Sequence, residues 1–183
     1  MKNLFYIFLF LFVVGPLAGH SEELKCKKGS QVMTNDYTRA LSLIRGGERL
    51  TEEQEKDVVH SLEIAVASQC QQAALVLADF KINQAAALPK GTSQRTVDDF
   101  DDEIHALLLE ADKIGEGCFQ LGSFYLTSGS KYFAPKKGLR ILEAAAHAGD
   151  EQAIEFLANI YQNGIAGVKP DSSKAHYWKA KLK

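Results

Sequence analysis

The stretch EAAAHAGDEQAIEFLANIYQNG, residues 143–164, decides the fold of this chain. Ala, Gly or another small residue stands at nearly every fourth position, and almost none of those positions holds a side chain that could do chemistry. Small residues at helical spacing allow two helices to approach closely. The stretch therefore predicts closely packed helices, which is a device for packing and not for catalysis.

Helical signals continue in both directions from this stretch, with hardly any strand pattern. Residues suited to begin a helix precede most of the apolar periodic runs: Asn35, Thr51 (with Gln54 completing a capping box), Thr96, Pro135, Asp150 and Asp171. We predict about eight helices, near residues 35–45, 51–67, 71–83, 96–112, 116–128, 135–148, 151–163 and 172–182. The fold class predicted is all-α.

The helices resemble one another, which makes the chain a repeat protein. At one fixed offset, residues 62–83 match residues 142–163, with Leu, Glu and Ala recurring in the same order. A middle unit shares the landmarks LLEA at 108–111 and LGSFY at 121–125. We therefore expect an α/α superhelix, a solenoid of stacked antiparallel helix hairpins. Its units are expected at about 51–88, 96–131 and 132–168, with a C-terminal capping helix at 171–182.

The N-terminus has the layout of a secretory signal peptide. A lone Lys2 precedes an apolar run from Leu4 to Val14, which is followed by a Gly-Pro break and small residues. Residues 1–20 are predicted to be this signal, cleaved near residues 18–21; residues 21–50 form an N-terminal segment with one capping helix, and 51–183 the solenoid. The alternative is an N-terminal membrane anchor, but the run is short for a bilayer span. The predicted location is periplasmic or secreted, with no stable membrane insertion after cleavage.

The charge balance and the three cysteines limit the classes of protein to which this chain could belong. The 21 basic and 23 acidic residues leave a net charge of −2 and no basic block, so nucleic-acid binding is not expected. Cys26, Cys70 and Cys118 would meet an oxidising compartment, where one disulfide with one cysteine left over is expected. Three pairings are open at this point.

The C-terminal third resembles the Sel-one-like repeat family, relatives of the tetratricopeptide repeats. The residues that carry the resemblance are Ala144-Ala145, Gly149-Asp150, Ala153, Leu157-Ala158, Tyr161, Gly164, Gly167-Val168, Asp171, Lys174-Ala175, Trp178 and Lys179-Ala180. The likeness weakens towards the N-terminus, and residues 24–50 match no known pattern. The resemblance implies a stack of hairpins whose concave surface binds an extended peptide or a partner domain.

The resemblance also bears on the cysteines. Disulfides in cysteine-rich secreted members tie the two helices of one unit together, but the corresponding positions for Cys70 and Cys118 hold Leu62 and Glu110. We therefore favour a pair between Cys26 and Cys70, which staples the N-terminal segment onto the first hairpin. Cys118 then stays outside the bridge. It lies near a helix N-terminus, which lowers a thiol pKa, but no adjacent His could serve as its base.

Two features are candidates for partner binding. Tyr132 and Phe133 lie in a loop that departs from the repeat pattern, either as interface anchors or tucked onto the core. Asp98, Asp99, Asp101 and Asp102 lie at a helix start, where they either interact with the helix dipole or form a patch for a basic partner.

These observations favour a non-enzymatic periplasmic protein-binding module, a repeat adaptor or scaffold of the cell envelope that needs no cofactor or metal. Its expected partner is an envelope protein. One alternative is an immunity protein that neutralises a toxin effector delivered to the periplasm. A second alternative is a protein that binds or hydrolyses beta-lactams or peptidoglycan fragments, suggested by a Ser-x-x-Lys string at residues 128–131. That string lacks the companion motifs of penicillin-recognising enzymes, so no catalytic residue is assigned.

Overall fold

The structure, a computed structural model, describes residues 31–45, 50–112 and 117–182, with side chains from Asp36 onward. Within these ranges every element is helical and there is no strand, which confirms the all-α prediction. The elements are α1 (Gln31–Arg45), α2 (Glu52–Ala67), α3 (Gln71–Ala86), α4 (Gln94–Asp112), α5 (Cys118–Phe124), α6 (Pro135–His147), α7 (Glu151–Asn163), the short 3-10 helix η1 (Ile165–Gly167) and α8 (Ser172–Lys179).

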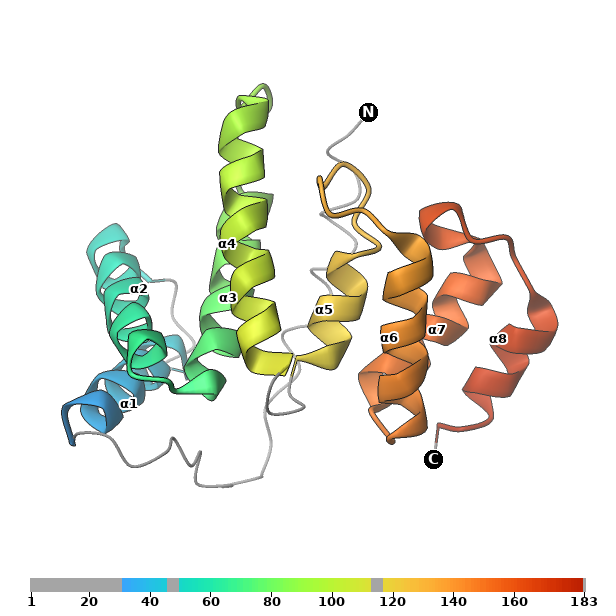
Figure 1. Cartoon of the computed structure of the whole chain (residues 1–183), viewed down its shortest axis with the longest axis horizontal. Coiled ribbons are helices and arrows are strands. Elements are labelled where there is room, and N and C mark those ends of the chain that lie inside the picture. The colour runs from blue at the N-terminus through green and yellow to red at the C-terminus, as the bar shows by residue number, and fades with distance from the viewer. Residues whose placement is uncertain (1–30, 46–49, 113–116, 183) are drawn as a thin grey trace.

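The helices form a row along the long axis of the molecule. Each helix packs on its neighbours in sequence, so the hairpins α2–α3, α4–α5 and α6–α7 follow one another between α1 and α8. Figure 1 shows α1 and α2 at one end of this row and α8 at the other, with the first half of α4 projecting beyond its neighbours. The stack of helical hairpins expected from the repeats is thus the architecture of the described chain.

The core is divided into segments along the row. One cluster of buried side chains joins α1, α2 and α3 around Leu62, a second joins α3, α4 and α5 around Leu108, and a third joins α6, α7 and α8 around Leu157. A segmented core is what a row of stacked units requires, because a single hairpin cannot bury both of its faces.

Small residues bring α5 and α6 into backbone contact. A Cβ atom at Gly138 would lie 2.6 Å from the carbonyl oxygen of Gly122, and one at Gly122 would lie 2.7 Å from Cγ of Leu142. No real side chain fits at such distances. The role in packing that the sequence predicts for small residues therefore extends to this glycine pair.

Most of the predicted helix starts are confirmed. Thr51 forms the capping box with Gln54, and the side chains of Asp150 and Asp171 accept the backbone N–H groups of Ala153 and Lys174. Each of these bonds satisfies an N–H group that has no partner within its own helix.

Several predicted boundaries are wrong. The third helix ends at Ala86 and not near residue 83, and the last helix ends at Lys179 and not at residue 182. The first helix begins at Gln31, so Asn35 lies inside it and not at its start. Thr96 lies inside α4, and Ser93 Oγ instead accepts the Thr96 N–H at 3.2 Å. The fifth helix ends at Phe124, well before residue 128, because the chain turns there and Ala134 N donates to the Tyr125 carbonyl oxygen at 2.8 Å. The N-cap is the residue whose side chain accepts a free N–H group at the start of the helix. Several serines and threonines near Thr96 could fill that role.

The predicted signal peptide, residues 1–20, and Cys26 lie outside the described residues. In the ranges that are described, no helix combines the length and the apolar character needed to cross a bilayer.

Candidate functional site

The start of α4 and the loop between α5 and α6 are joined by a set of hydrogen bonds, here named the clasp. It consists of Asp101, Asp102, Ser130, Lys131 and Tyr132. The Asp101 side chain is buried, and its Oδ2 accepts the Lys131 backbone N–H at 3.0 Å. The Asp102 carboxylate accepts from Lys131 Nζ and from Tyr132 Oη, both at 2.6 Å.

The two clasp carboxyls differ in their electrostatics. Burial raises the pKa of Asp101, although hydrogen bonds from Ser130 and the Lys131 backbone oppose that rise. The pKa of Asp102 is lowered, first by the hydrogen bond from the Lys131 ammonium and then by the Tyr132 hydroxyl. Asp101 therefore loses its hydration when it binds the loop backbone. The Asp102 carboxylate stays charged and binds two side chains.

Behind the clasp lies a polar and aromatic cluster. The Tyr132 ring stacks on His105 with ring centroids 3.9 Å apart, and Lys137 Nζ donates to Tyr125 Oη at 2.7 Å. Tyr125 Oη lies 2.7 Å from His105 Nε2. Burial, followed by the nearby Lys137 charge, lowers the pKa of His105. The Tyr125 hydroxyl thus joins the Lys137 ammonium to the His105 ring.

The structure separates the residues that the sequence grouped as candidates. Of the loop pair, Tyr132 is tucked onto the core side while the Phe133 side chain is 41% exposed. Of the four aspartates, Asp101 and Asp102 hold the loop, Asp98 accepts from Gln94 Nε2 at 2.9 Å, and Asp99 is exposed. Asp101 is thus removed from the surface, whereas Asp98, Asp99 and Asp102 stay on the outer side of α4. Partner binding by any of these residues stays a prediction.

The Ser-x-x-Lys string lies in the same loop. Residues 128–131 precede α6 without forming a helix start, and the Lys131 ammonium is bound by Asp102. In this position the lysine does not meet the hydroxyl of Ser128 as a catalytic base would.

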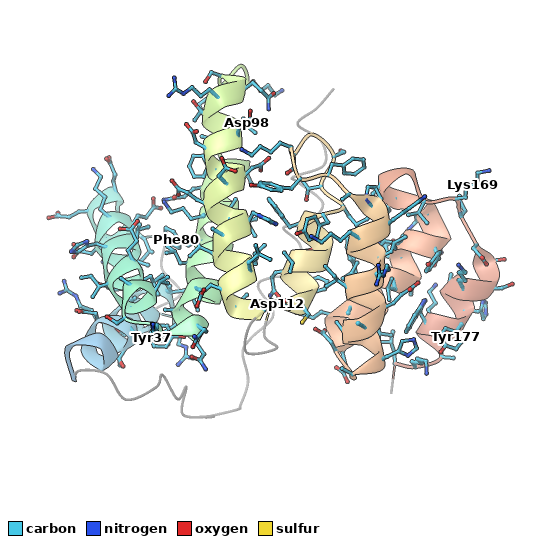
Figure 2. The ribbon with its side chains drawn as sticks, viewed as in Figure 1. Tyr37, Phe80, Asp98, Asp112, Lys169 and Tyr177 are labelled. Atoms are coloured by element: carbon cyan, nitrogen blue, oxygen red, sulfur yellow. The ribbon has the colours of Figure 1, made fainter. Side chains whose placement is uncertain are left out.

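A second feature of the surface is a hollow between α2 and α3, which sequence analysis did not find. Its volume is about 360 Å³, and its lining residues are Glu52, Glu55, Lys56, Val59, His60, Glu63, Lys81 and Gln84. In Figure 2 the label of Phe80 marks α3 between α2 and α4. The hollow itself is lined by residues of α2 and α3, and α4 adjoins it through the ion pair between Lys81 and Glu103. We name this surface the α2–α4 groove.

The α2–α4 groove is acidic. Lys56 Nζ pairs with Glu52 at 2.7 Å, and Lys81 Nζ pairs with Glu103 of α4 at 2.8 Å. Both of the groove's lysines are thereby neutralised, while no ion pair within the described residues involves Glu55 or Glu63. The sequence does not single out these glutamates, because their neighbours across the groove come from α3, about 20 residues along the chain.

The two described cysteines have different chemistry. Cys118 Sγ donates to Asp112 Oδ1 at 3.2 Å, and burial, followed by that contact and the Asp112 charge, raises the thiol pKa to about 11. The expectation of a lowered pKa at a helix N-terminus is therefore wrong, because burial, followed by the Asp112 carboxylate, outweighs the effect of the short α5. Cys70 is buried at the N-cap of α3 and is disulfide-bonded. Its pairing with Cys26 stays a prediction, since Cys26 is outside the described residues.

In residues 36–45, 50–112 and 117–182, no group of three or more His, Cys, Asp or Glu side chains could hold a metal ion. The chain matches no family model, no curated protein and no solved structure. The resemblance to Sel-one-like repeats therefore remains an interpretation of the sequence.

Proposed function

We propose that this protein is a non-enzymatic protein-binding module of the Sel-one-like repeat type that works in the periplasm or after secretion. The location rests on the signal-like residues 1–20. The observation that carries the binding role is the α2–α4 groove, an acidic hollow between α2 and α3 whose Lys81 pairs with Glu103 of α4. A groove on a stack of hairpins is a surface on which such proteins bind extended or helical segments of partners.

The charge of the groove selects a class of partner. Glu55 and Glu63 present carboxylates without ion pairs in the described chain, and Val59 supplies an apolar strip beside them. A segment with Lys or Arg side chains flanking an apolar or aromatic residue complements this lining. Its association would be accelerated at low ionic strength and weakened by salt.

The polar clusters elsewhere support binding over catalysis. Lys131, Tyr132 and Lys137 are each engaged by partners within the molecule, so they serve to order the loop between α5 and α6. The Cys118 thiol, with its pKa raised to about 11, is a weak nucleophile near neutral pH.

Affinity capture from a cell-envelope fraction tests this proposal. The tagged wild-type chain is compared with the double variant Glu55→Lys and Glu63→Lys. The matched control is Glu151→Lys and Glu155→Lys, because both residues are exposed on α7 and the charge change is the same. We expect one dominant protein at equal stoichiometry with wild type and control, and its loss with the groove variant.

The same experiment separates the alternatives. A captured toxin, inhibited on binding, would identify the immunity role, whereas an envelope component would identify an adaptor. Retention that is equal for all three chains would contradict the groove as the binding surface. Covalent labelling of the native chain by a fluorescent beta-lactam would contradict a non-enzymatic role.

A further inference from the structure

The C-terminal helix α8 buries one face against the core, and the residues of its other face are exposed. Ala175 and Trp178 are buried against the third core cluster. Lys174 and Tyr177 of α8 and Lys181, in the turn that follows the helix, are all exposed. Lys174 Nζ also lies 4.8 Å from the centre of the Tyr161 ring on α7. We name these three residues, Lys174, Tyr177 and Lys181, the basic stripe of α8. The Tyr177 side chain is 49% exposed, the largest fraction among the exposed large apolar and aromatic side chains.

The exposed tyrosine is held in place on this face. Its ring packs edge-on against Trp178 with centroids 5.0 Å apart, and Lys181 Nζ lies 4.9 Å from the centre of the Tyr177 ring. An ordered aromatic side chain beside a lysine has the composition of an interface anchor, because little side-chain entropy remains to be lost on binding.

The two ends of the row carry opposite charge. Residues 172–182 contain three lysines, one histidine and no acidic residue, whereas α2 contains five carboxylates and a single lysine. Figure 1 places α2 and α8 at opposite ends of the molecule, so α8 cannot reach the groove of its own chain. The basic α8 of one copy is therefore complementary in charge to the acidic α2 of another copy.

We propose that the basic stripe of α8 docks in the α2–α4 groove of a second copy, which makes this chain its own partner. The proposal rests on the groove of the proposed function and names one occupant for it. Lys174 and Lys181 would face Glu55 and Glu63 of the next copy, with Tyr177 entering between them as the anchor. Because the two surfaces differ, the contact is heterologous and builds a ring or an open chain of copies.

Sedimentation velocity of the purified chain over a range of concentrations tests this assembly. We expect species larger than a monomer at about 50 mM salt and mostly monomer at about 500 mM, since opposite charges are screened at the higher concentration. The double variant Lys174→Glu and Lys181→Glu should weaken self-association by at least about tenfold, as should Glu55→Lys with Glu63→Lys. Tyr177→Ala should weaken it without changing any charge.

Mixing the two charge-reversed variants gives the decisive result. An acidic α8 then meets a basic groove, and each unchanged surface still meets its native complement, so association should return although neither variant associates alone. The matched control is Lys90→Glu with Lys136→Glu, which makes the same charge change at exposed positions away from α8 and should leave assembly unchanged.

Monomer at every concentration and at low salt would overturn the proposal, and so would assembly that none of these variants alters. Failure here is distinguishable from failure of the proposed function. If the chain is monomeric while the groove variant still loses a captured protein, the groove binds another partner and self-assembly alone is rejected.

Discussion

Tyr132 Oη donates a 2.6 Å hydrogen bond to Asp102 Oδ1 across 30 residues of sequence. The bond connects an aromatic loop and an acidic helix start, which as sequence features are unrelated. Together with the Asp101 contact to the Lys131 backbone, it fixes the loop between α5 and α6 on the side of α4. The clasp thus links the second hairpin to the beginning of the third.

The clasp predicts that Asp101 and Asp99, two residues apart on α4, contribute unequally to the free energy of unfolding. Asp101→Ala leaves the Lys131 N–H without its acceptor in a buried position, which should lower the free energy of unfolding by about 1–3 kcal/mol. Asp99→Ala, on the exposed side of the same turn, should change it by less than about 0.5 kcal/mol. Urea denaturation of both variants measures the difference. Equal losses of stability in the two variants would show that the aspartates stabilise the protein only through their position at the start of the helix.

The close crossing of α5 and α6 predicts that Gly138 tolerates no side chain. Gly138→Ala places a methyl group against the Gly122 carbonyl oxygen, so the helices must separate. We expect a loss of about 1–3 kcal/mol in thermal or urea unfolding despite the better helix propensity of alanine. Lys136→Ala, exposed in the same helix, is the control and should be nearly neutral. A stabilised Gly138→Ala variant would disprove the close packing.

The half-buried Asp79 on α3 predicts a specific pH dependence. Burial raises the pKa of this carboxyl to about 6. The folded state then binds the proton more tightly than the unfolded state, so its contribution to stability is largest below the unfolded pKa and falls as the pH rises from about 4 to about 6.

Asp79→Asn removes that titration. The variant should be more stable than wild type at pH 7, by about 1–2 kcal/mol, and close to it near pH 4. Asn159 occupies the equivalent position of the third hairpin, which shows that the repeat accommodates the amide. Chemical denaturation at both values measures the effect. A gain that is the same at both pH values would point to a cause other than ionisation.

The raised pKa of Cys118 predicts slow alkylation. At pH 8 only a small fraction of this thiol is ionised, because its pKa is raised to about 11. Asp112→Asn removes the carboxylate that accepts from Sγ and repels the thiolate, so the rate of iodoacetamide labelling at Cys118 should rise by about tenfold. Mass spectrometry of the native protein assigns the labelled residue. A rate unaffected by the substitution would leave burial as the sole cause of the shift.

Much of the fold follows from local sequence. The capping side chains of Thr51, Asp150 and Asp171 bond within three residues, and that local contact is visible in the sequence. Thr96 shows the limit of this reasoning, since neighbouring hydroxyls compete and the helix begins earlier, at Gln94. The repeat of small residues likewise predicts the hairpins, because close helix packing requires it wherever they stack.

The sequence by itself determined an all-helical row of hairpins, since caps, breakers and small-residue spacing act over one or two turns of helix. Only the tertiary structure decided which polar side chains meet. Asp102 could be part of a surface patch or part of a clasp, and the choice depends on a loop 30 residues away. The α2–α4 groove likewise arises when residues of α2 and α3 come together and Lys81 pairs with Glu103 of α4. Packing of whole hairpins sets such distances, and no periodicity along the chain encodes them.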